Sequence, residues 1–552
     1  MSQDNRPVNG VAGLQKVDMK VTGIIVMVYC LCSAGAFGIE EMIPAAGPGM
    51  SIILLLVFPI IWGYPICNCV SECGSLLPEE GGIYIWVREA FGEFWAFLAN
   101  WWGIMALVVV NGTFVVLSAN YMSQLMPMSA AADQAVKVGM IAIVTIVNLL
   151  GLKGVERFST ALSVVILLAF LLVAVVGIIN WQTNPVSPIV PEGYRILDGV
   201  GAGIPICIWM YCGYEALSNM AGELKNPQVL PKGLLIALPL IALSYVLPVI
   251  GSIASMPKGS WMLWSTEGGF SVGYATTLLN NLGHIWGYIF LVIAIIAQFA
   301  ILNAYVASGS RSFLVLADDC LAPKCLMKLS RNRRIPYVCI LLMAVLAWLF
   351  AQFEFGILVM VEVIFMLAIY VIIPLAVIKL RKMYPIEERK EQGLYVMPGK
   401  TLGLVYFVGA PVVIAVITML LSGTDYFFVG VIALATSPII YMIVKWLFGG
   451  LYQVSPKTHP LNRKTRLAFG DLRRLGLMIL LSGGFSFLGQ FWLRWYEIEY
   501  GMWSPEMYTA FGDMIPQIQD WLLWGGLIAA AVGAILLLIG KKVEIEENKL
   551  GV

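Results

Sequence analysis

The sequence predicts an all-α membrane protein of about fourteen transmembrane helices. We expect it to be built as a five-plus-five inverted repeat in which helices 1 and 6 are broken. Of the 552 residues, 60% are hydrophobic and 12% are charged, whereas soluble proteins carry about 45–50% apolar and about 25% charged residues. The apolar runs are long and continuous, which excludes the alternating pattern of a β-barrel. Two glycine-containing interruptions at matching places predict the inverted repeat.

The apolar runs set the expected spans. One crossing of a bilayer needs about 20 apolar residues, and runs of about that length recur through most of the chain. Segments 82–91 and 270–281 are expected to form short helices between spans. The expected spans are 21–48, 50–76, 93–126, 134–151, 157–180, 199–221, 233–255, 283–316, 336–352, 356–380, 402–423, 425–449, 472–493 and 521–540.

The distribution of Lys and Arg predicts the orientation, because cytoplasmic loops carry an excess of these residues. With the N-terminus inside, four of the 34 cationic residues lie outside, which leaves 30 at the cytoplasmic side. We therefore expect a multi-pass protein of the cell (cytoplasmic) membrane with both termini in the cytoplasm. The first 20 residues show no signal-peptide pattern. The four outer residues are Lys137, Arg195, Lys258 and Arg494.

We expect three parts in the chain. These are a cytoplasmic tail at 1–20, a core of twelve helices at 21–450, and two extra helices with a tail at 451–552. No polar segment is long enough for a separate soluble domain, and the net charge of +1 gives no electrostatic case for nucleic acid. The two histidines and ten cysteines lack metal-ligand spacing. We therefore expect neither an enzyme nor a bound metal or cofactor.

Two glycines mark the expected breaks. Gly35 in span 1 and Gly213 in span 6 both lie near the middle of their spans and are 178 residues apart. Glycine also serves close packing between membrane helices, which is the alternative interpretation of each one alone. Interruptions at corresponding positions of two inverted halves instead favour a transporter binding site. There the freed N–H and C=O groups can hold a carboxylate, an ammonium group or a cation.

Three carboxylates accompany these breaks. Glu40 follows the first glycine by five residues, Glu215 follows the second by two, and Glu362 lies in span 10. A carboxylate in hydrocarbon is costly unless it faces a cavity or a partner. We expect Glu215 to take up a coupling proton, with Glu40 and Glu362 as further candidates. Alternatively, Glu40 lies near the outer end of span 1 or caps a half-helix. Glu72 is expected to be a structural partner of a helix end or an arginine.

Four motifs, in order, resemble the amino acid–polyamine–organocation superfamily of secondary transporters. SAGAFGIEEMIPAAGP (33–48) resembles its span 1, and PEEGGIYIWVREAFG (78–92) resembles the loop after span 2. WMYCGYEALSNMAGELKNPQ (209–228) is similar to its span 6 and the following turn, and SRSFLVLADDCLAP (310–323) to the loop after span 8. The first two motifs are closest to the polyamine transporter branch.

The resemblance implies a LeuT-like fold and alternating access, as a symporter or antiporter, for an amino acid or a polyamine. It assigns the backbone around Gly35 to the binding of a substrate carboxylate. Trp209 matches the aromatic residue that closes over the substrate in some members, and Asn111 matches an asparagine of the polyamine branch. Packing of Trp209 and an interhelical hydrogen bond of Asn111 are the alternatives. The substrate-binding residues expected are Ser33, Ala34, Gly35, Phe37, Glu40, Asn111, Trp209, Tyr211, Cys212, Gly213 and Glu215.

Two departures from the family pattern leave questions open. Several proton-coupled relatives carry a lysine in span 5, whereas residues 157–180 of this chain hold none and Ser163 lies near that position. Both H⁺ and Na⁺ therefore stay open as the coupling ion. The two extra C-terminal helices are candidates for homodimer contacts. The rival functions are a sensor or scaffold with a transporter fold and a membrane-embedded enzyme, which would need a nucleophile–base pair or a metal cluster.

Overall fold

The computed structural model describes residues 10–32, 35–264, 273–462, 467–499 and 512–549. Helices dominate this part of the chain, which contains two isolated β-bridges and no longer strand. Long apolar segments cannot leave their backbone polar groups unbonded in hydrocarbon, and an α-helix bonds them internally. The prediction of an all-α, multi-pass membrane protein is confirmed.

Eleven helical stretches of the described chain are long and apolar enough to cross a membrane. They are α3–α4 (Pro48–Leu76), α6 (Glu93–Leu125), α7 (Ala130–Asn148), α8 (Leu152–Ile179), α10 (Val229–Ser255), α12 (His284–Asp318), α14 (Phe355–Met383), α16 (Lys400–Leu421), α17–α18 (Thr424–Val454), α19 with its π-helical end (Asp471–Glu499), and the stretch Gly512–Ile545, which contains most of α20 (Ile515–Lys549).

Three shorter apolar helices occupy the places of predicted spans 1, 6 and 9. They are α1 (Val21–Leu31), α9 (Ile196–Met210) and α13 (Tyr337–Phe350). After α1 come a 3₁₀ turn η2 (Ile39–Glu41) and α2 (Met42–Ala46), and after α9 comes the 3₁₀ helix η4 (Ala216–Glu223). Short helices α5 (Ile83–Phe91) and α11 (Tyr274–Leu282) lie where 82–91 and 270–281 were predicted.

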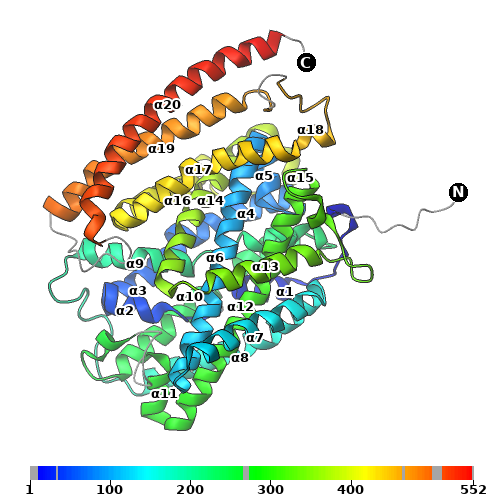
Figure 1. Cartoon of the computed structure of the whole chain (residues 1–552). Helices are drawn as coiled ribbons and strands as arrows, with labels where there is room; N and C mark the ends of the chain where they lie inside the picture. Colours follow the sequence, from blue (N-terminus) through cyan, green and yellow to red (C-terminus); the bar gives the residue numbers. More distant parts are fainter. Residues whose placement is uncertain (1–9, 33–34, 265–272, 463–466, 500–511, 550–552) are drawn as a thin grey trace.

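The long helix α6 lies inside the bundle, where it packs against α12, α13 and α14. At the edge of the molecule α19 and α20 run side by side as a hairpin (Figure 1). A Cβ atom at Gly476, Gly483 or Gly533 would collide with the backbone of the opposite helix. These glycines therefore let the two backbones approach closely, as small residues do in membrane helix pairs.

Different short helices lie at the two ends of the bundle. In Figure 1, α5, α15 (Ile386–Glu391) and α18 (Leu451–Val454) lie at one end and α11 lies at the opposite end. Buried ion pairs join distant elements near the first end. Glu223 accepts a 2.7 Å bond from Arg311 of α12, and Glu93 of α6 lies 2.6 Å from Lys445 of α17. The stretch 10–20 also bonds there, because Val17 N–H donates to Glu223 O at 2.6 Å.

The carboxylate of Glu72 in α4 holds two arginines. It accepts two 2.7 Å bonds from Arg381 at the end of α14 and a 3.0 Å bond from Arg389 of α15. The Met397 N–H also donates to it at 2.9 Å. The expectation that Glu72 is a structural partner of an arginine is confirmed.

Glu72→Gln should destabilise the fold strongly. The substitution leaves two arginines, 9% and 3% exposed, without their counter-charge, and breaking a buried pair in this way costs about 3–5 kcal/mol. Thermal unfolding of the purified variant measures this loss. Glu391→Gln, on the exposed side of α15, is the control and should change stability by less than about 0.5 kcal/mol. Equal effects of the two substitutions would contradict the structural role of Glu72.

Candidate functional site

Two glycines that follow the end of α1 take left-handed backbone conformations. Gly35 has φ of 118° and Gly38 has φ of 85°, which residues with a side chain rarely adopt. A Cβ atom at Gly35 would collide with the ring of Phe170, and one at Gly38 would lie 2.8 Å from the ring of Trp209. The predicted residues Ser33 and Ala34 lie outside the described residues.

The second interruption follows α9 and lies directly against the first. Gly213 has φ of 96°, and a Cβ atom there would collide with the carbonyl oxygen of Leu31. The glycine therefore serves both a left-handed turn and a close approach between the ends of α1 and α9. The two segments that the sequence singled out meet inside the bundle.

Tyrosine hydroxyls bind the carbonyl groups that the two helix ends leave without helical partners. The Tyr305 hydroxyl of α12 donates to Leu31 O at 2.5 Å. The Tyr245 hydroxyl of α10 lies within hydrogen-bond distance of Cys32 O and is 3.1 Å from Met210 O. Because the last carbonyls of a helix have no partner within it, these contacts satisfy the interruptions from neighbouring spans.

Glu215 faces the second interruption. Its carboxylate accepts a bond from the Tyr370 hydroxyl of α14, and the same hydroxyl accepts a 2.9 Å bond from Gly213 N–H. The side chain is buried, with 2% of the residue exposed. The carboxylate, the tyrosine and the turn of the backbone thus form one chain of hydrogen bonds.

Glu362 of α14 contacts the end of α9 and the interruption that follows it. The Trp209 Nε1–H donates to its Oε2 at 3.0 Å, and Cys212 Sγ lies 3.8 Å from its Oε1. The Trp209 ring packs between Phe114 of α6 and Phe355 of α14, at centroid distances of 5.8 and 5.6 Å. The interruption after α9 therefore carries two buried carboxylates and an aromatic cluster.

Glu40 closes the turn that begins η2. Its Oε2 accepts a 2.8 Å bond from Gly38 N–H, and its Oε1 accepts a 3.1 Å bond from the Tyr121 hydroxyl of α6. Phe37 packs on the rings of Tyr121 and Phe170 at 5.8 and 4.7 Å. This geometry supports the capping alternative for Glu40, because its carboxylate binds a free N–H at the start of a helical turn.

Asn111 of α6 is completely buried, and neither atom of its amide group has a hydrogen-bond partner among the described residues. It lies three residues before Phe114 and so on the same side of α6. Phe114 packs against Trp209 and also against Tyr305, at 5.7 Å. An unpartnered buried amide is unusual in a protein core. Asn111 is therefore a candidate for binding a ligand through its amide group.

Tyr211 and Ser163 each form a contact with a neighbouring helix. The Tyr211 hydroxyl donates to Leu55 O of α3 at 2.9 Å, so this side chain braces α9 against a neighbouring helix. Ser163 of α8 lies 3.0 Å from Cys30 Sγ near the end of α1. This contact joins the two helices through small polar side chains.

Sequence reasoning missed the three tyrosines. Tyr245, Tyr305 and Tyr370 lie well inside α10, α12 and α14, whereas tyrosine in membrane helices is enriched at the two interfaces. That displacement from the interface is the signal that could have found them. Their partners on α1 and α9 are not visible in the sequence.

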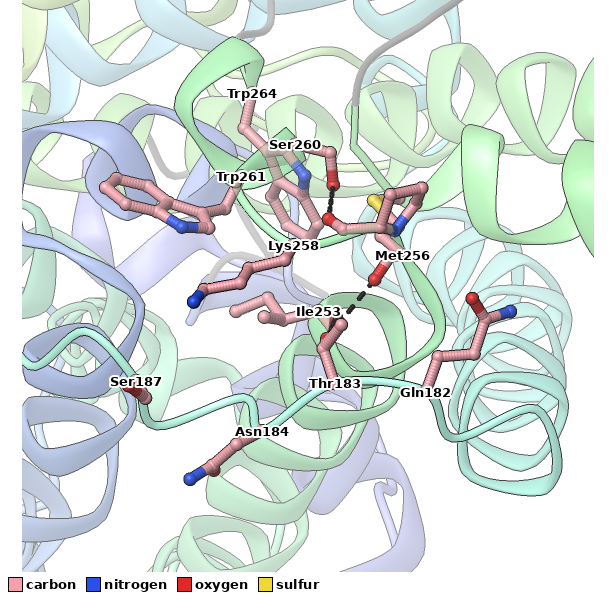
Figure 2. A pocket seen from close by; sticks show the side chains of 12 residues that line it. Gln182, Thr183, Asn184, Ser187, Ile253, Met256, Lys258, Ser260, Trp261 and Trp264 are labelled. Atoms are coloured by element: carbon pink, nitrogen blue, oxygen red, sulfur yellow. Dashed lines mark hydrogen bonds between the residues drawn. The ribbon is translucent and has the colours of Figure 1, made fainter.

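A polar pocket of about 320 Å³ lies in the loops at the ends of α8 and α10, next to the 3₁₀ turn 260–263 (Figure 2). Thr183 donates to Ile253 O at 3.0 Å and fixes the wall that also carries Lys258. Trp264, which lines the pocket, packs on Tyr274 of α11 at 5.4 Å.

Among the described residues, no group of three His, Cys, Asp or Glu side chains is placed to hold a metal ion.

Residues 21–449 match the family described as amino acid permease. The chain is 29% identical to Polyamine transporter PUT1 of Oryza sativa subsp. japonica over 272 residues, 48% of each chain. It is 29% identical to Polyamine transporter RMV1 of Arabidopsis thaliana over 345 residues, 60% of this chain and 67% of that one. Branched-chain amino acid permease BcaP of Lactococcus lactis subsp. cremoris (strain MG1363) is 24% identical over 308 residues, 52% and 64% of the two chains.

The match therefore spans about half the length of the rice transporter. The family match confirms the resemblance that the four motifs indicate.

Asn111→Leu should stabilise the ligand-free protein. The substitution removes a buried amide that has no partner, and an unsatisfied group costs about 1–3 kcal/mol. Asn148→Leu is the matched control, because Asn148 is equally buried but its amide donates to Asn303 Oδ1 at 2.9 Å. That variant should lose stability. Thermal unfolding of both measures the contrast, and destabilisation by Asn111→Leu would show that its amide is satisfied.

Proposed function

We propose, from the premise that the chain belongs to the amino acid permease family, that it is a secondary active transporter. It carries a small amine-bearing solute, an amino acid or a polyamine, across the cell membrane by alternating access. The observation that carries this proposal is the contact between the ends of α1 and α9, beside which the buried carboxylates of Glu215 and Glu362 are hydrogen-bonded. In the LeuT-like fold that the family implies, such interruptions form the substrate site.

Different residues of the site are proposed to bind the positively and the negatively charged groups of the solute. Glu215 and Glu362 supply acceptors for an ammonium group, and Trp209 supplies a ring face for the same cation. The backbone N–H groups near Gly35 are the proposed partners of a carboxylate, and Asn111 adds a donor and an acceptor. The names of the relatives, polyamine transporters and a branched-chain amino acid permease, support both solute classes.

We propose that a proton drives transport through Glu215. The carboxylate accepts from Tyr370, which also accepts from Gly213 N–H. Protonation replaces a charge-assisted hydrogen bond, worth about 1.5–3 kcal/mol, with a weaker neutral one. The hydrogen-bonded contact between Tyr370 of α14 and the interruption after α9 is then weaker. This weakening couples the proton to movement of one helix bundle against another.

We also propose that both termini are cytoplasmic. The uneven distribution of cationic residues supports this orientation. So does the placement of α15 and α18 at the end opposite α11 (Figure 1). The hairpin of α19 and α20 is the proposed surface for a homodimer.

Uptake of labelled putrescine and of a labelled branched-chain amino acid into proteoliposomes tests the function. Uptake of either one supports a transporter. Binding of a solute without any uptake would favour the rival function, a sensor or scaffold with a transporter fold. Asn111→Leu, if it is stable, should lose binding of the transported solute.

Glu215→Gln should abolish the dependence of uptake on a pH gradient and leave some exchange of solute. The glutamine keeps a hydrogen-bond acceptor for Tyr370 but takes up no proton. Uptake with and without an imposed gradient measures the effect. Glu354→Gln, at the exposed start of α14, should keep the full dependence on the gradient. A sodium requirement in the unaltered protein would contradict proton coupling.

Glu40→Gln separates a role in selectivity from a role in capping. If Glu40 binds a second ammonium group, affinity for putrescine should fall roughly 10-fold to 150-fold, because a charge-assisted bond of about 1.5–3 kcal/mol is lost. Affinity for a neutral amino acid should then change little. Binding of both solutes to the same variant decides between the roles. Equal losses, together with lower thermal stability, would leave Glu40 as the cap of η2.

A further inference from the structure

An apolar groove of about 310 Å³ runs between the transporter core and the C-terminal hairpin. Residues of α6, α14, α16, α17 and α19 line it, and all of them are aliphatic, aromatic or methionine side chains. The indole N–H of Trp102 is occupied, because it donates to Ser437 Oγ at 2.9 Å. The lining thus offers no carboxylate, hydroxyl or amide to a polar ligand.

One side of the groove opens to the surroundings of the protein. Leu375, Val416 and Leu481 at its rim are 42%, 41% and 56% exposed. Its floor is buried, with 4% of Leu367 and 8% of Met419 exposed. The groove is therefore closed at its floor and open on one side, and this side contacts the medium that surrounds the protein.

The depth of the groove identifies that medium as hydrocarbon. The lining stretch of α14, 364–375, lies in the middle of a helix that runs from Phe355 to Met383, and the lining stretch of α19, 478–485, lies in the middle of Asp471–Arg494. Both helices are long and apolar enough to cross a bilayer. Acyl chains surround such helices at mid-depth, and dispersion contacts there stabilise any group that fills a recess.

We propose that this groove is a binding site for one acyl chain of a bilayer phospholipid. A sterol is a poorer occupant, because its hydroxyl finds no side-chain oxygen in the lining. The hairpin completes the site, since α19 lies beyond residue 449, where the family match ends. Helix α19 therefore completes a lipid site that the core alone lacks.

The bound chain would pack against the helix that carries two groups of the candidate functional site. On α14, Leu367 and Val371 line the groove, whereas Glu362 and Tyr370 contact the interruption after α9. Both of the latter are completely buried. The lipid and the interruption thus contact the same helix through different side chains.

A phospholipid with a photoreactive diazirine in its acyl chain tests the proposal on the full chain in lipid nanodiscs. Cross-links should concentrate on the lining stretches of α14, α16 and α19. Ala368→Phe places a ring in the groove from the α14 side and should lower labelling of these stretches about 10-fold, as overpacking by ~1.4 kcal/mol would. Ala531→Phe, at an exposed position of α20, is the matched control and should leave this labelling unchanged.

Three results would overturn the proposal: uniform labelling of all lipid-facing helices, unchanged labelling in Ala368→Phe, or displacement of the phospholipid by a photoreactive sterol. If Ala368→Phe aggregates on gel filtration, Leu481→Trp narrows the mouth of the groove instead. Its control is Leu488→Trp on the same helix, at a position 68% exposed and outside the groove. Labelling needs no transport, so its outcome is separate from that of the proposed function.

Discussion

The contact between the ends of α1 and α9 is the constraint on which the rest of the structure depends. Inside a bilayer every backbone polar group must find a partner within the protein, and two interrupted helices release several such groups at once. Gly213 brings its backbone against Leu31, and tyrosines from α10 and α12 bind the released carbonyls. These neighbours must lie where they do, because otherwise the interruptions would be left unbonded.

Helix α14 connects this contact to the remainder of the bundle. Its Tyr370 accepts a bond from Gly213 N–H in the interruption after α9, and its Glu362 accepts one from Trp209 at the end of α9. At its end, Arg381 is held by Glu72 of α4. A change in charge at a carboxylate beside the interruption therefore acts on a helix that is anchored at one end and packed along its length. That arrangement gives a physical basis for coupling a proton to movement.

Buried asparagines of the core differ in how their amide groups are bonded. Asn148 donates to Asn303, and Asn303 donates to Val155 O of α8, so both join helices as ordinary interhelical hydrogen bonds do. Asn111, on the side of α6 that faces the aromatic cluster, has no such partner among the described residues. The amides of Asn148 and Asn303 are therefore structural, whereas the unpartnered amide of Asn111 is a candidate for binding a ligand.

The sequence by itself determined the class of the protein, the approximate limits of its long helices and the two glycines at which the backbone turns. These features depend on local properties, namely apolar length and the freedom of glycine at positive φ. It also indicated that Glu72 would be a structural partner of a helix end or of an arginine, and the structure shows the arginines. Only the tertiary structure decided that Trp209 donates to Glu362, 153 residues away, and that Tyr305 binds Leu31, 274 residues away. The physical reason is that such contacts depend on which helices become neighbours, and apolar helices of similar length and composition do not specify their neighbours in their own sequences.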